Sequence, residues 1–139
     1  MKPSGKYDNP KLKKQELKIE QPIYGYNGFL LGIADGISER TFRYEFTMTN
    51  YYGNEEEVGH GEKTFAIIYE IKPVLNSVSA ALGQLKSYIN SLANRRRYEK
   101  IFGLIVTLDK ETKFDNMLKS QGINILHLSC DETGEIASS

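Results

Sequence analysis

The sequence predicts an α/β protein with a mixed central sheet flanked by helices. Three observations carry this prediction. Residues 37–52 alternate large apolar side chains with polar ones, which is typical of a half-buried strand. Residues 64–72 form an almost continuous apolar run closed by Pro73, which is typical of a buried strand. Residues 78–92 place apolar side chains on one stripe at helical spacing, which predicts an amphipathic helix.

The other elements follow from turn residues and shorter patterns in the chain of 139 residues, which has the length of one domain. The expected helices cover residues 10–20, 77–94 and 114–120, and the expected strands cover residues 23–31, 37–52, 64–72, 100–108 and 123–128. Either Asn76 or Ser77 caps the second helix. The acidic, glycine-rich segment 53–62 is expected to be a loop, and residues 1–9 and 132–139 to be flexible tails. This order predicts an antiparallel meander followed by right-handed crossovers.

Composition narrows the function classes. Basic and acidic residues balance at 18 each, so the chain is not a strongly basic nucleic-acid coat. Cys130 is the single cysteine, which excludes an internal disulfide and a metal site built from cysteines. No apolar run reaches roughly 18 residues, so no membrane partner is expected. Cytoplasmic residence is the default expectation.

Two carboxylates are predicted to converge at the end of the meander. Folding the chain about Gly53 brings Asp35 opposite Glu70, and Lys72 shares the strand face of Glu70 because side chains alternate along a strand. Adjacent carboxylates repel unless a proton or cation neutralises one of them. Mg²⁺ or Mn²⁺ suits oxygen ligands, and a cation beside an ammonium group suits phosphodiester hydrolysis. Glu45 is the rival acidic residue, but its mid-strand position favours solvent exposure.

The second expected helix carries two polar residues at the edge of its apolar stripe. Gln84 and Tyr88 are one turn apart, so their side chains lie on the same helix face. An edge position beside the sheet allows them to reach the ends of the meander strands. They are therefore candidates to support the carboxylate site.

Three motifs in this order resemble the RecB-type branch of the PD-(D/E)xK nuclease superfamily. They are Gly32-Ile33-Ala34-Asp35, Glu70-Ile71-Lys72 and Gln84-x-x-x-Tyr88. The resemblance covers about Gly32 to Tyr88. It implies one nuclease-like domain over residues 1–139 with a restriction-endonuclease-like fold, and a metal-dependent deoxyribonuclease activity.

The resemblance also implies residue roles. The implied catalytic residues are Asp35, Glu70, Lys72, Gln84 and Tyr88, and the implied metal ligands are Asp35, Glu70 and the backbone carbonyl of Ile71. Many RecB-type members have a histidine upstream of the aspartate, and this chain has none there. Glu16 or Glu20, on the expected first helix, is the candidate to take its place, and the choice between them stays open.

DNA is the expected partner. Lys86, Arg95, Arg96 and Arg97 are candidate contacts to the phosphate backbone. Exonuclease action is slightly favoured over endonuclease action, and a homodimer or a larger DNA-processing complex stays open. Two alternatives are a non-catalytic nucleic-acid-binding module on the same fold, and an accessory protein-interaction domain that docks through the acidic segment.

Overall fold

The computed structural model describes residues 4–7, 10–95, 97–130 and 136–138. Their elements are β1 (Ser4–Tyr7), β2 (Lys11–Tyr24), β3 (Leu30–Thr49), β4 (Glu55–Ile71), α1 (Val78–Ala93), β5 (Lys100–Thr107), α2 (Asp115–Ser120), β6 (Ile123–Cys130) and β7 (Ile136–Ser138). The strands form one seven-stranded sheet. The pairs β4–β5 and β5–β6 are parallel and the others antiparallel. The predicted α/β class with a mixed sheet is therefore confirmed.

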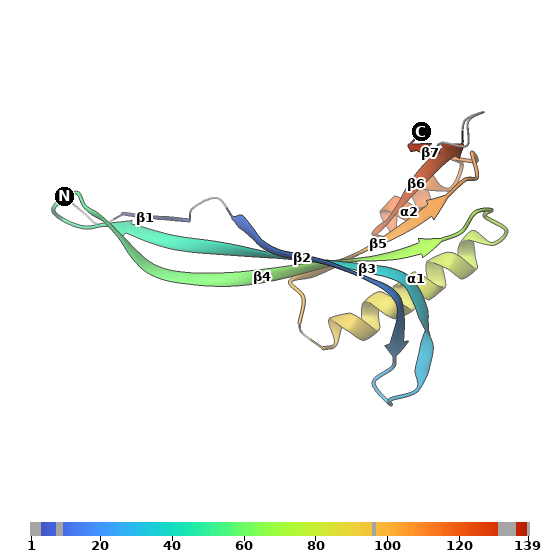
Figure 1. Ribbon diagram of the computed structural model, residues 1–139, viewed down its shortest axis with the longest axis horizontal. Helices are drawn as coiled ribbons and strands as arrows, with labels where there is room; N and C mark the ends of the chain where they lie inside the picture. The colour runs from blue at the N-terminus through green and yellow to red at the C-terminus, as the bar shows by residue number, and fades with distance from the viewer. Residues whose placement is uncertain (1–3, 8–9, 96, 131–135, 139) are drawn as a thin grey trace.

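The sheet has a long arm and a broad base (Figure 1). β3 and β4 pair from Gly36–Tyr69 at the base to Thr49–Glu55 near the tip of the arm. β1 and the first part of β2 flank β3 along this arm. The base adds β5, β6 and both helices. Its end of the β3–β4 pair carries Asp35 and Glu70, and the other residues that the sequence predicted to be catalytic follow β4 or lie on α1.

The helix predicted over residues 10–20 is wrong, because strand β2 occupies this segment from Lys11 onward. β2 pairs with β3 from Lys11–Arg43 to Tyr24–Leu30. Leu17 and Ile19 are spaced two apart, which fits a strand, and the predominantly polar segment offers too little apolar surface to hold a short helix against a core. Pairing also satisfies backbone groups that β3 would otherwise leave open at its edge.

Three further boundaries differ from the prediction. The strand predicted at residues 23–31 is interrupted by a turn in which the Gly25 N–H donates to the Phe29 carbonyl. The segment 53–62 is mostly strand, because the turn between β3 and β4 closes by residue 54 and β4 then pairs with β3. β1 and β7 occupy parts of the expected tails. The rest of those tails lies outside the described residues.

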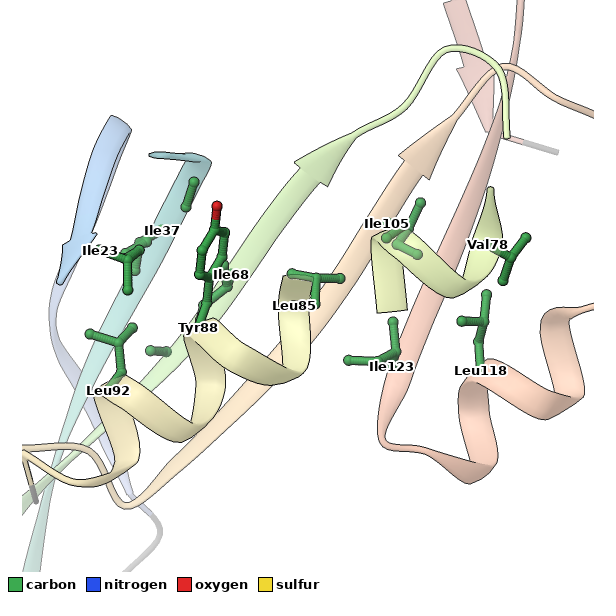
Figure 2. Close-up of a cluster of buried hydrophobic side chains, with 13 residues drawn as sticks. Ile23, Ile37, Ile68, Val78, Leu85, Tyr88, Leu92, Ile105, Leu118 and Ile123 are labelled. Carbon is green, nitrogen blue, oxygen red and sulfur yellow. The ribbon is translucent and has the colours of Figure 1, made fainter. Parts of the chain in front are cut away.

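Helix α1 matches the prediction closely. Ser77 is its N-cap, and the Ser77 hydroxyl accepts a hydrogen bond from the Ala80 N–H at 3.3 Å. Leu85, Tyr88 and Leu92 project from α1 into one core that includes Ile68 and other strand residues, as Figure 2 shows. Within the described part of the chain, no helix is long and apolar enough to span a membrane.

The two faces of the sheet differ in burial. On β4, Ala66, Ile68 and Glu70 are buried beneath α1, and we call this side the helix face. Phe65, Ile67 and Tyr69 point the other way and are only half-buried, and we call that side the open face. The same alternation runs along β5, where the buried side chains again share the helix face.

Candidate active site

Asp35 and Glu70 meet where β3 and β4 leave their shared ladder. Gly36 pairs with Tyr69, so the next residues along the two strands are Asp35 and Glu70. The Ile71 N–H donates to Asp35 Oδ2 at 2.6 Å, which ties the Asp35 carboxylate to the end of β4. The predicted convergence is confirmed. The Ile71 N–H is turned to this site, while its carbonyl stays a predicted metal ligand.

Glu70 is a buried carboxyl group with one orphaned oxygen. Its exposed fraction is 2%, and Oε1 has no hydrogen-bond partner among the described residues. Oε2 lies 3.9 Å from Lys72 Nζ. Burial is the main cause that raises the pKa of Glu70 to about 7; the Asp35 charge adds to the rise and the Lys72 ammonium opposes it. A buried oxygen without a partner costs about 1–3 kcal/mol, so this group is suited to take up a proton or a cation.

Gln84 and Tyr88 are linked to each other and to the first motif. The Gln84 amide donates to the Tyr88 hydroxyl oxygen at 2.8 Å. A Cβ at Gly32 would lie 2.0 Å from that oxygen, so only glycine allows the ring to fit against β3. Burial raises the pKa of Tyr88, and the charges of Glu70 and Asp35 contribute to the rise. The three motifs that are separated in sequence therefore meet in one place.

The donor set fits a hard divalent cation. Mg²⁺ commonly takes one or two protein carboxylates and keeps several waters, and Asp35 with the orphaned Glu70 oxygen supplies two.

No group of three or more His, Cys, Asp or Glu side chains in the described chain is arranged to hold a metal. Neither Glu16 nor Glu20 therefore completes such a group. Both lie on β2 rather than on a helix, and Glu16 is 3.5 Å from Lys14 Nζ.

A cleft separates the end of β4 from the start of α1. It has a volume of about 250 Å³, and Lys72, Asn76, Ser77 and Gln84 are among its lining residues. The backbone of Lys72 is fixed because its N–H donates to the Val106 carbonyl at 2.9 Å. The Lys72 side chain is 38% exposed. An ammonium group and a helix N-terminus on one cleft favour an anionic group.

The predicted DNA-contacting residues lie elsewhere on α1 and after it. Lys86 Nζ donates to Gln121 Oε1 at 2.7 Å. The Arg95 guanidinium donates to the Tyr24 carbonyl at 3.4 Å, and Arg97 pairs with Glu39 at 3.1 Å. Arg96 lies outside the described residues. The two described arginines thus make contacts within the protein that the sequence did not predict.

Sequence reasoning missed Glu39, a second buried carboxylate on the helix face. Tyr98 donates its hydroxyl to Oε1, Arg97 donates to Oε2, and Lys18 lies 3.3 Å from Oε1. Burial alone would raise the pKa of Glu39, but these three partners together lower it below its usual value. The available sequence signal was its spacing of two residues from Ile37, which is also turned towards the helix face.

Comparison with known proteins adds no relative. No protein-family model matches the sequence, no curated protein is significantly similar to it, and no solved structure is significantly similar to its fold.

Proposed function

We propose that this protein is a metal-dependent DNA nuclease of the PD-(D/E)xK type, with a restriction-endonuclease-like fold, that hydrolyses phosphodiester bonds. The observation that carries the proposal is the orphaned oxygen of buried Glu70 between Asp35 and Lys72. A purely structural carboxylate at this depth would have its oxygens paired. The succession β3, β4, α1 and β5 is compatible with the proposed fold.

The roles follow from position and charge. Asp35 and Glu70 would hold Mg²⁺ or Mn²⁺, with the Ile71 carbonyl as a further ligand. The cation, when bound, supplies Lewis-acid polarisation of the phosphate and acidifies a water. Lys72, which lines the cleft, would offset the negative charge that builds on the phosphate in the transition state.

Gln84 and Tyr88 act as positioning residues in this proposal. Their mutual hydrogen bond and the fit of Tyr88 against Gly32 fix the helix relative to β3. The Gln84 side chain also lines the cleft, where it can contact phosphate or Lys72. Lys86 and Arg95, both exposed, would add sequence-independent contacts to the DNA backbone.

A cleavage assay tests the proposal. Linear duplex, covalently closed circular and single-stranded DNA are incubated with Mg²⁺, Mn²⁺ or EDTA. We expect cation-dependent cleavage that falls at least about 100-fold in Glu70→Gln and in Lys72→Ala. Loss of linear DNA with circles spared would identify an exonuclease, and nicked or opened circles an endonuclease.

Glu39→Gln is the matched control, because Glu39 is also buried on the helix face but has all its charge partners within the protein. It should cleave like the wild type at a temperature where it is folded. No cleavage by the wild-type protein, or full cleavage by Lys72→Ala, would refute the proposal.

A further inference from the structure

The open face of the base lacks the cover that a parallel sheet normally has. β4, β5 and β6 pair in parallel, and parallel strands are almost always buried on both faces. Here α1 and α2 contribute to a single core on the helix face. No helix in the described part of the chain packs on the open face. The outward residues of β4 and β5 are nevertheless apolar: Phe65, Ile67, Tyr69, Ile71, Phe102, Leu104 and Val106.

Two grooves run along this face. The first, of about 300 Å³, lies between β2 and β4 and is lined by Leu17, Ile19, Tyr69 and Ile71, among others. Leu17, Ile19 and Ile71 are 64%, 68% and 57% exposed. The second groove, of about 280 Å³, is lined by three phenylalanines of β3, β4 and β5. A contiguous apolar surface of this kind marks an interaction site.

We propose that the open face is a homodimer interface, in which the open face of a second copy of this chain packs against it. Two β-sheets stack face to face about 10 Å apart, with side chains of one sheet entering the grooves of the other. A two-fold symmetric dimer uses the same surface on both subunits, so that surface must be complementary to itself. An apolar sheet face with grooves can be complementary to a second copy of itself. The chain has no net charge, so two copies do not repel each other as a whole.

The few charges on the face also suit a second copy. Arg40 and Asp35 both line the first groove and lie five residues apart on β3, roughly 16 Å. Arg40 has no ion-pair partner among the described residues, and Asp35 lies at the groove's other end. Stacking two copies with β3 antiparallel places Arg40 of each near the acidic end of the other. A parallel arrangement would instead bring like charges together.

The flat area of the face is a little over half of what a standard interface buries. Five strands about 4.8 Å apart and seven residues of about 3.3 Å each give roughly 460 Å². A standard interface buries about 800 Å² of accessible surface per partner, and protruding side chains make the accessible surface of the face larger than its flat area. The apolar part of the interface does not depend on the nuclease activity, whereas the pairing of Arg40 with Asp35 applies to the cation-free protein.

Sedimentation velocity on the full chain over micromolar concentrations tests this interface. We expect the wild type to sediment as a dimer. Ile19→Glu and Arg40→Glu should each raise the dissociation constant, Ile19→Glu by roughly 100-fold or more. Circular dichroism should show both variants folded, because Ile19 and Arg40 are exposed in the single chain.

Met117→Glu is the matched control. Met117 is 39% exposed on α2, which packs on the helix face, and it lines neither groove, so its variant should remain dimeric. A wild-type protein that stays a single chain throughout, even if it captures a different protein, would overturn the proposal. So would a dimer that Ile19→Glu leaves intact, or one that Met117→Glu disrupts equally.

Discussion

Two buried carboxylates on the helix face, Glu39 and Glu70, have opposite surroundings. Glu39 is 6% exposed and meets Tyr98, Arg97 and Lys18. Glu70 is 2% exposed, has an oxygen without a partner, and lies beside a second carboxylate. The pKa of Glu39 is lowered and that of Glu70 is raised. Burial is similar at the two places, so the partners determine that the pKa of one carboxyl group falls and that of the other rises.

The largest expected effect is on the pH dependence of stability, to which Glu70 and Glu39 contribute in opposite ways. The folded pKa of Glu70, about 7, lies above its ordinary value of 4.5. Its protonated form is therefore favoured by folding, and the contribution is full below pH 4.5 and lost as pH rises to about 7. The limit is roughly 3 kcal/mol of unfolding free energy. Urea denaturation of the metal-free protein should show this loss, and Glu70→Gln should abolish it. If the unfolding free energy of Glu70→Gln fell with pH as steeply as that of the wild type, Glu70 would not be the group that causes the fall.

Removing Glu39 should have the next largest effect. Glu39→Ala leaves the Tyr98 hydroxyl without its acceptor and separates Arg97 from its partner, at a cost of about 2–3 kcal/mol. The partly exposed Lys18 and Arg97 can return to water, which limits the cost. Thermal denaturation measures the change. A variant as stable as the wild type would mean that the network contributes nothing net.

The sequence predicted the region around Glu70 better than the region around Glu39. Asp35, Glu70, Lys72, Gln84 and Tyr88 come from short motifs on strongly patterned elements, and the structure brings them together. The network of Glu39 joins residues from β2, β3 and the segment after α1, with no local pattern to identify it. The lack of a hydrogen-bond partner at Glu70 Oε1 likewise depends on three-dimensional packing, and no sequence pattern predicts it.

The arm was the least predictable part of the fold. The segment 10–20 has few apolar residues, so its strand state depends on pairing with β3 rather than on its own pattern. β4 begins in the acidic run at Glu55, because the partner strand β3 extends that far. In both segments a long-range pairing overrode a local signal.

A methyl group added at Gly32 should disturb the surroundings of Glu70 and leave those of Glu39 unchanged. Gly32→Ala forces Tyr88 away from β3, because the new Cβ would be 2.0 Å from the hydroxyl oxygen. We expect a loss of about 1–2 kcal/mol in stability and weaker cation binding, while the Glu39 network stays intact. A double variant with Tyr88→Phe, which removes the clashing oxygen, should recover part of the lost stability. No recovery would argue against this contact as the cause.

The smallest expected effect is at the cap of α1. Ser77→Ala removes the acceptor for the Ala80 N–H and should cost about 1 kcal/mol. Because Ser77 lies on the cleft rather than beside Glu70, the pH dependence of stability that comes from Glu70 should remain. Chemical denaturation at several pH values measures both quantities. A changed slope would show that the cap and Glu70 are coupled.

Calorimetric titration of Mn²⁺ tests the central claim most directly, that Glu70 with Asp35 forms a cation site whereas Glu39 does not. The wild type and Glu39→Gln should bind the ion with the same affinity. Glu70→Gln should bind it at least about tenfold more weakly. Equal affinity in Glu70→Gln and the wild type, or no binding by the wild type, would contradict the account.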